Sequence, residues 1–159
     1  MLDWANNDSQ IERLLRQVIG ATIQQDVGSG KAFVLTNEAA GNGKSTFLNL
    51  VVSFLGLPNI ATVSLQAMAK DSHQAAALVG KFANIVDDMS GDFVGDISTF
   101  KTLCTGGYAV INPKHVKPYT VRLTATCILC CNKIPRIGDT TNGLNDRLVI
   151  VPFFSSLSR

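Results

Sequence analysis

Three consecutive residues, Gly43, Lys44 and Ser45, have the types and order of a phosphate-binding turn. Small residues let backbone N–H groups approach phosphate oxygens, and the start of a helix adds positive potential. In such a turn Lys44 would reach the β- and γ-phosphates of a nucleoside triphosphate, and the Ser45 hydroxyl would bind Mg²⁺. We predict that the turn extends from Glu38 to Thr46 and that its nucleotide-binding residues are Gly41, Asn42, Gly43, Lys44, Ser45 and Thr46.

The first position of this pattern, usually glycine, holds Glu38. A carboxylate that faced inward would repel phosphate. A carboxylate that faced away would cost only the backbone freedom that glycine gives at this position, because Gly41 and Gly43 still flank the closest approach of the backbone to the phosphate. We expect nucleotide binding to survive.

Two carboxylates, Asp87 and Asp88, follow an apolar segment over 82–86 that is typical of a buried strand. Parallel strands present their carboxyl ends to the ligand crevice, so acids placed there can hold Mg²⁺ and polarise an attacking water. The alternative is a solvated acidic turn, which the preceding phosphate-binding turn makes the weaker interpretation. We predict that Asp87 binds Mg²⁺ with Ser45 and that Asp88 positions the water.

Two further polar residues lie at the ends of apolar segments. Asn132 follows a strand predicted over 122–131, where its amide would orient the water or contact the γ-phosphate, or would simply occupy a turn. Arg147 precedes the last predicted strand, 148–154, and by itself would be an ordinary surface charge.

Three of the four cysteines lie close together, at positions 127, 130 and 131. A Cys-x-x-Cys pair can indicate metal or redox chemistry. Because side chains of a strand alternate between its faces, Cys127 and Cys130 would point to opposite sides and could not share a zinc ion. We predict small buried thiols in a core strand, which suit a reducing compartment.

Charge is divided unevenly along the chain. Residues 1–100 hold six Lys and Arg against ten Asp and Glu, whereas residues 101–159 hold eight against two. No acid occurs between Asp96 and Asp139. This basic half contains Lys101 and a hairpin, predicted from strands over 108–111 and 119–123, whose tip carries Lys114, His115 and Lys117. Charged tips also serve solubility, but the missing acids favour contact with a phosphate backbone.

The remaining pattern supplies the elements that must position these residues. Helical spacing predicts helices over 9–23 (with Ser9 as N-cap), 47–55, 72–79 and 96–104, and apolar runs predict a strand over 32–35 and an extended piece over 61–64. With 159 residues, 46% of them hydrophobic, the chain is long enough for one domain. We predict a single domain, in which 1–30 form a helix and lead-in loop packed on a core of 31–159.

The order of these segments resembles the helicase domain of phage and plasmid primase-helicases, in superfamily 3 of the AAA+ ATPases. The matching stretches are 18–20, 41–48, 82–88, 100–107, 131–135 and 142–153. They span nearly the whole chain. The combination of Asn-Gly-Lys-Ser-Thr with a later Asn-x-x-Pro and a terminal Arg-x-x-x-x-Pro-Phe is specific. Gly107 stands where many relatives carry aspartate.

The resemblance implies an α/β P-loop core of AAA+ type, with a mostly parallel sheet flanked by helices and an inserted β-hairpin. It implies that Asn132 senses the γ-phosphate and that Arg147 is an arginine finger acting on ATP held by a neighbouring subunit. Lys114, His115 and Lys117 would then follow single-stranded DNA through the pore of a ring, usually a hexamer. The expected cofactors are ATP and Mg²⁺, and the expected partners are DNA, further copies of the chain and a primase module.

Two other interpretations remain open from the residues. One is a P-loop NTPase or kinase without a nucleic-acid partner, and the other is a remnant that binds DNA or nucleotide without turnover. The absence of charge from Ser45 to Ala69 does not indicate a membrane span, because polar residues and Pro58 interrupt it. No signal-peptide pattern opens the chain. We therefore expect no membrane partner and a location in the cytoplasm, that of a bacterial host if a phage or plasmid encodes the protein.

Overall fold

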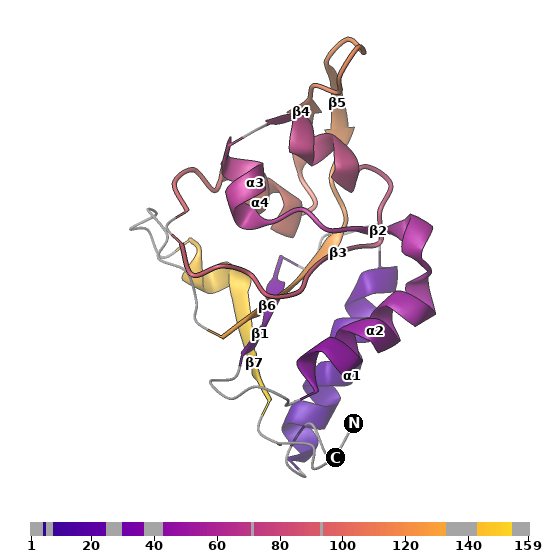
Figure 1. The fold of residues 1–159 in the computed structure, drawn as a ribbon, viewed down its shortest axis with the longest axis vertical. Coiled ribbons are helices and arrows are strands. Elements are labelled where there is room, and N and C mark those ends of the chain that lie inside the picture. Colours follow the sequence, from indigo (N-terminus) through magenta and orange to yellow (C-terminus); the bar gives the residue numbers. More distant parts are fainter. Residues whose placement is uncertain are drawn as a thin grey trace.

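The computed structural model describes residues 5, 8–24, 30–36, 43–70, 72–92, 94–132 and 143–153. These residues form a five-stranded sheet with helices on both faces, and a separate two-stranded hairpin (Figure 1). The predicted α/β fold, with an inserted β-hairpin, is confirmed.

The elements follow one another along the chain as α1 (Ser9–Ile23), β1 (Ala32–Thr36), α2 (Lys44–Leu55), η1 (Leu57–Asn59), β2 (Ile60–Ala61), α3 (Leu65–Lys70), η2 (Ser72–Leu78), β3 (Ala83–Val86), α4 (Ser98–Cys104), β4 (Tyr108–Ile111), β5 (Tyr119–Arg122), β6 (Thr126–Cys131), η3 (Asn145–Arg147) and β7 (Leu148–Pro152). The symbol η denotes a 3₁₀ helix.

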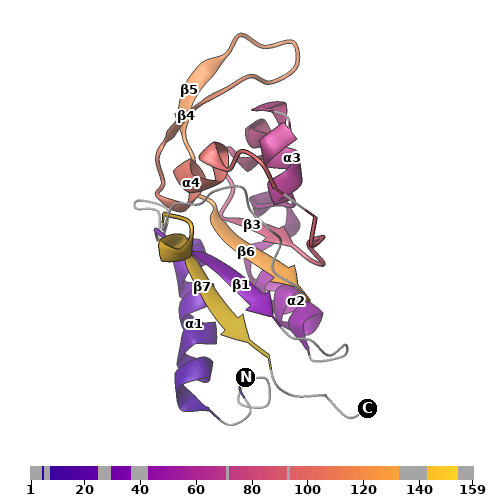
Figure 2. The ribbon, with the colours of Figure 1, turned by 90° about the vertical axis from the view of Figure 1, so that its left-hand side faces the viewer.

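The large sheet has the strand order β2-β3-β6-β1-β7, and all its adjacent strands are parallel. Strand β6 lies between β1 and β3, with Thr36 opposite Cys131 and Val86 opposite Leu129. The segments that follow these three strands therefore emerge side by side at the carboxyl ends of the strands. In Figure 2 the arrowheads of β1, β6 and β7 all point to this end of the sheet.

One face of the sheet is covered by α1 and α2. Leu15 and Val18, three residues apart on α1, are fully buried there, as apolar side chains on one side of a helix should be. From α2, Phe47 packs against Phe153, with ring centroids 6.0 Å apart and ring planes tilted by 59°. Because the N–H of Phe153 donates to the carbonyl of Thr36 at 2.9 Å, this contact places the start of α2 near the ends of β7 and β1.

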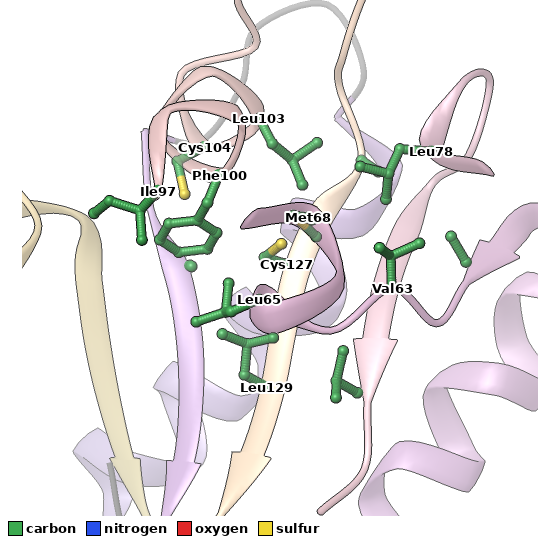
Figure 3. Close-up of a cluster of buried hydrophobic side chains, with 14 of the residues drawn as sticks. Val63, Leu65, Met68, Leu78, Ile97, Phe100, Leu103, Cys104, Cys127 and Leu129 are labelled. Atoms are coloured by element: carbon green, nitrogen blue, oxygen red, sulfur yellow. The ribbon is translucent and has the colours of Figure 1, made fainter. Parts of the chain in front are cut away.

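The opposite face is covered by α3, η2 and α4 (Figure 3). Phe100 and Leu103 of α4 and Met68 of α3 pack onto Cys127 and Leu129 of β6. Both faces of the central strands are thus apolar, which explains why the six residues of β6 are all buried.

Cys127 and Cys130 belong to different hydrophobic clusters, one on each face of the sheet. Their predicted placement on opposite sides of a strand is confirmed. All four cysteines, the fourth being Cys104, are buried and free. Burial raises the pKa of the Cys127 thiol to about 12, although the side chain of Asn84 opposes this shift.

Several local predictions need correction. The N-cap of α1 is Asp8, not Ser9, because the Asp8 carboxylate accepts a hydrogen bond from the N–H of Gln10 at 2.8 Å. Helix α3 was not predicted, since six residues are too few for a clear periodic pattern. The segment predicted as a helix over 72–79 is the 3₁₀ helix η2. The extended piece predicted over 61–64 is a strand only at its first residue, where it overlaps β2.

Candidate functional site

The start of α2, from Gly43 onward, has features that suit anion binding. Gly43 precedes the helix with φ 86° and ψ 4°, a left-handed conformation that glycine adopts without strain. No side chain among the described residues caps this helix, and the backbone N–H groups at a helix N-terminus favour anions. Ser45 and Thr46 are exposed beside them. Donors, positive potential and hydroxyl groups therefore meet at one point.

Lys44 joins this turn to the end of β6. Its Nζ donates a hydrogen bond to Oδ1 of Asn132 at 3.0 Å, although the two residues are 88 positions apart in the chain. The contact follows from the strand order, since β1 and β6 are neighbours and both residues lie just beyond their ends. The structure thus brings together the predicted phosphate-binding lysine and the predicted sensor.

The two carboxylates follow β3, the other neighbour of β6, at the same end of the sheet. Asp87 and Asp88 follow β3 directly and are exposed. Asp88 has φ 58°, a left-handed conformation that aspartate tolerates better than most residues. The chain then turns back onto β6, where the N–H of Met89 donates to the carbonyl of Cys130 at 2.7 Å. This hydrogen bond fixes the acid pair against the strand that carries Asn132.

The pKa of the Cys130 thiol responds to three of these charged groups. Burial raises the pKa of the Cys130 thiol to about 12; the Asp87 carboxylate also raises it, and the Lys44 ammonium opposes both. Asp88 acts in the same direction as Asp87. Lys44, Asp87 and Asp88 are therefore all close enough to the end of β6 to act on the Cys130 thiol, which is only 1% exposed.

This set of charges fits ATP and Mg²⁺. Mg²⁺ is typically bound through one or two carboxylates together with substrate phosphates and water, and lysine neutralises the phosphates. Asp87 and Ser45 are the residues that would hold the ion. No cluster of three or more His, Cys, Asp or Glu suited to a metal occurs among the described residues. Gly41, Asn42 and Glu38 lie outside the described residues.

Arg147 lies at the opposite end of the sheet, where the strands begin. It ends η3 immediately before β7, whose first residue, Leu148, is opposite Ala32 at the beginning of β1. Its Nη1 donates to the carbonyl of Gly143. Burial raises the pKa of the nearby Cys104 thiol, and the Arg147 charge partly opposes this shift. Arg147 therefore lies where β1 begins, whereas Lys44 contacts Asn132 just beyond the end of β6.

The predicted hairpin is present, with β4 and β5 antiparallel and Tyr108 opposite Arg122. Lys114, His115 and Lys117 are exposed at its tip, where His115 has φ 64°. Figure 2 shows the hairpin beyond the end of the large sheet at which the strands begin, far from the end of β6. Lys101, the fourth predicted nucleic-acid contact, is half-buried on α4 and not on the hairpin.

Gly107 connects α4 to this hairpin in a crowded position. A Cβ placed there would lie 3.1 Å from Cγ2 and 3.4 Å from the carbonyl oxygen of Thr102. The N–H of Gly107 donates to that same carbonyl at 2.9 Å, and its own carbonyl accepts from Leu123 at 3.0 Å. Glycine at this position, in place of the aspartate expected from the resemblance, allows this close approach.

A family model described as "Family of unknown function (DUF5906)" matches residues 35–147. The chain belongs to this family. The match covers every site residue named above, from the end of β1 to Arg147. No curated protein gave a significant match to this DUF5906 chain.

Solved structures with the same fold cover nearly the whole chain. The A form apo structure of the NrS-1 C-terminal region matches with a TM-score of 0.73 and 18% identity, over 98% of this chain and 36% of that one. A second apo structure of the NrS-1 C-terminal region gives a TM-score of 0.71 and 19% identity, over 98% and 37%. JCV helicase bound to a small molecule gives 0.61 and 12%, over 92% and 41%. The DUF5906 chain thus has the fold of these domains and spans well under half of their length.

Two features of the site were missed from the sequence. The sequence predicts only a core position for Cys130, yet the charges of Asp87, Asp88 and Lys44 all act on its thiol. Gln66 lies on the unpredicted α3, and its Nε2 donates to the carbonyl oxygen and to the hydroxyl of Ser90, each at 3.2 Å. This contact holds the segment that follows Asp88, and no sequence signal indicated it. Among the described helices, none has the length and apolar character that a membrane crossing requires.

Proposed function

We propose that this chain is the ATP-hydrolysing core of a ring-forming helicase or translocase of a phage or plasmid replication system. The observation that supports this most directly is the convergence of Lys44, Asp87, Asp88 and Asn132 at one end of the sheet. A phosphate-binding helix start, a carboxylate pair and an amide on neighbouring parallel strands are the parts that phosphoryl transfer to water requires.

The chemistry would be in-line attack of water on the γ-phosphate. Mg²⁺ bound through Ser45 and Asp87 would neutralise charge on the phosphate oxygens. Lys44 would stabilise the same oxygens, Asp88 would accept a hydrogen bond from the water, and Asn132 would contact the γ-phosphate. In this scheme the hydrogen bond between Lys44 and Asn132 positions both groups before ATP binds.

The location of Arg147 is consistent with a ring. Arg147 lies at the end of the sheet opposite the proposed ATP site of its own chain. In a head-to-tail assembly it would face the ATP bound by a neighbouring subunit. Further copies of the chain and single-stranded DNA are therefore the proposed partners, with a primase module in the same replication system. The basic tip of the hairpin would contact the DNA phosphates.

The test is the ATPase rate measured against protein concentration, with and without single-stranded DNA. We expect a rise steeper than linear with concentration and a further rise with DNA. Lys44→Ala should abolish hydrolysis, whereas Lys70→Ala, which removes an exposed lysine on α3, should not. Hydrolysis that depended on neither concentration nor DNA would instead identify an NTPase without a nucleic-acid partner. No hydrolysis under any condition would identify a non-catalytic remnant.

A further inference from the structure

The hairpin has an exposed face that its basic tip does not account for. Tyr108 is 74% exposed and Val110 is 68% exposed, and they alternate with residues that face the body of the protein. Across the hairpin they pair with Arg122 and Thr120, so these four residues share one side of the two strands. We refer to them as the Tyr108 face.

The opposite side of the hairpin is the one that packs on the protein. Ile111 is fully buried there, and Ala109 and Val121 contact the same cluster. The Tyr108 face is therefore held outward by packing behind it. Arg122 is held beside Tyr108 because its Nε donates to the carbonyl of Gly106 at 2.6 Å. An exposed tyrosine thus lies directly across the hairpin from an arginine.

The positive charge around this face favours a negatively charged partner. The chain has no acid between Asp96 and Asp139, so the whole hairpin is free of negative charge while it carries Lys114, Lys117 and Arg122. A polyanion would be attracted to it. Four side chains are also too few for a stable protein interface, which buries about 800 Å² on each partner. Aromatic side chains beside basic ones are the usual platform for single-stranded nucleic acid.

We propose that the Tyr108 face binds the bases of a single nucleic-acid strand, with Tyr108 stacking on a base and Arg122 beside its phosphate. This rests on the proposed function but assigns a second kind of contact to the hairpin. Tyr108 and the end of β4 at Ile111 are about 10 Å apart at the usual rise of a strand, and the tip lies beyond. One strand would therefore run along the hairpin, with its phosphates at the tip and a base on Tyr108.

The experiment compares three variants by fluorescence anisotropy with a labelled oligothymidylate. Tyr108→Ala should weaken binding at least about fivefold, the lower end for loss of one stacked base. Tyr108→Phe keeps the ring and should bind like the wild type. Tyr119→Ala is the matched control, because Tyr119 is 43% exposed on the same hairpin but opposite Ile111, on the other side. It should leave the affinity unchanged.

Two further measurements separate stacking from other effects. On an abasic strand of the same length, Tyr108→Ala should bind as well as the wild type, and its salt dependence on oligothymidylate should match that of the wild type. Unchanged affinity of Tyr108→Ala for oligothymidylate would overturn the proposal, and so would an equal loss in Tyr119→Ala or on the abasic strand. A change of oligomeric state with unchanged DNA affinity would show that a second copy covers this face. If the wild type bound no DNA at all, both this proposal and the proposed DNA partner would be wrong.

Discussion

The position of Arg147 leads to a prediction about which subunit it serves. Leu148, the next residue, is opposite Ala32, whereas the phosphate-binding turn follows Thr36 at the other end of β1. Four residues at about 3.3 Å each separate these two levels by about 13 Å. An arginine finger must contact the phosphate directly, so we predict that Arg147 acts on ATP bound by a neighbouring subunit and not on ATP bound by its own chain.

The assay mixes two inactive variants, Arg147→Ala and Lys44→Ala. Loss of an arginine finger costs about 10³–10⁵ in rate, which corresponds to about 4–7 kcal/mol of activation free energy. Each variant alone should therefore be inactive. In an equal mixture, sites that take Lys44 from one variant and Arg147 from the other are complete, and random assembly makes about one quarter of the sites complete. We expect recovery of up to about a quarter of the wild-type rate.

Three controls make this result interpretable. Arg147→Ala should still bind nucleotide, and both variants should show the oligomeric state and melting temperature of the wild type. Arg16→Ala removes an arginine from a surface pair with Glu12 at 2.6 Å and should leave the rate unchanged. An Arg147→Ala variant as active as the wild type would refute the assignment, and mixed rings without recovery would refute action on a neighbouring subunit.

The structure supports three other predictions. Gly43→Ala should lower the free energy of unfolding by about 1–2 kcal/mol because φ is 86°, whereas Gly20→Ala, inside α1 with no atom within 4 Å of its Cβ, should raise it by about 0.5–1 kcal/mol. Urea unfolding measures both, and equal effects would contradict the left-handed turn. Because the pKa of Cys127 is raised from 9.0 to about 12, the native state keeps a proton that the unfolded chain loses, so stability should fall from about pH 9 to pH 12. Cys127→Ala should lessen that slope by up to about 1.4 kcal/mol per pH unit, and an unaltered slope would exclude this thiol as its source. Lys114→Ala combined with Lys117→Ala should reduce the salt dependence of single-strand binding by about 1.4 in the log–log slope and spare basal hydrolysis; an unchanged slope would remove both lysines from the phosphate contacts.

The elements that carry the site could be predicted because each has a strong local signal. The apolar run before Lys44, the helical spacing after it and the apolar segment before Asp87 all appear in the structure at nearly the predicted bounds. The N-cap of α1 could not be chosen in the same way. Asp8 and Ser9 are both favourable caps, and only the hydrogen bond to Gln10 decides between them.

The relation between these elements could not be predicted from spacing. Nothing local in the sequence indicates that β6 lies between β1 and β3, yet this order alone places Asn132 within 3.0 Å of Lys44. The same order brings the charges of Lys44, Asp87 and Asp88 close enough to act on the Cys130 thiol. Residues 88 positions apart meet because of tertiary packing, and a single sequence holds no direct signal of such a pair.

The hairpin and the candidate ATP site lie at opposite ends of one strand. Arg122 ends β5, and β6 begins at Thr126 after a short segment whose first residue, Leu123, is fully buried and hydrogen-bonded to Gly107. At its other end β6 leads to Asn132 and its contact with Lys44.

Since β6 is hydrogen-bonded to β1 on one side and β3 on the other, it cannot stretch or shift alone. The hairpin is further held by the contact of His73 with the carbonyl of Asn112. Under the proposed function, ATP turnover at Lys44 therefore cannot bend the hairpin through β6 by local deformation. The hairpin would have to move with the whole sheet, as one subunit rotates against the next about the interface where Arg147 reaches its neighbour.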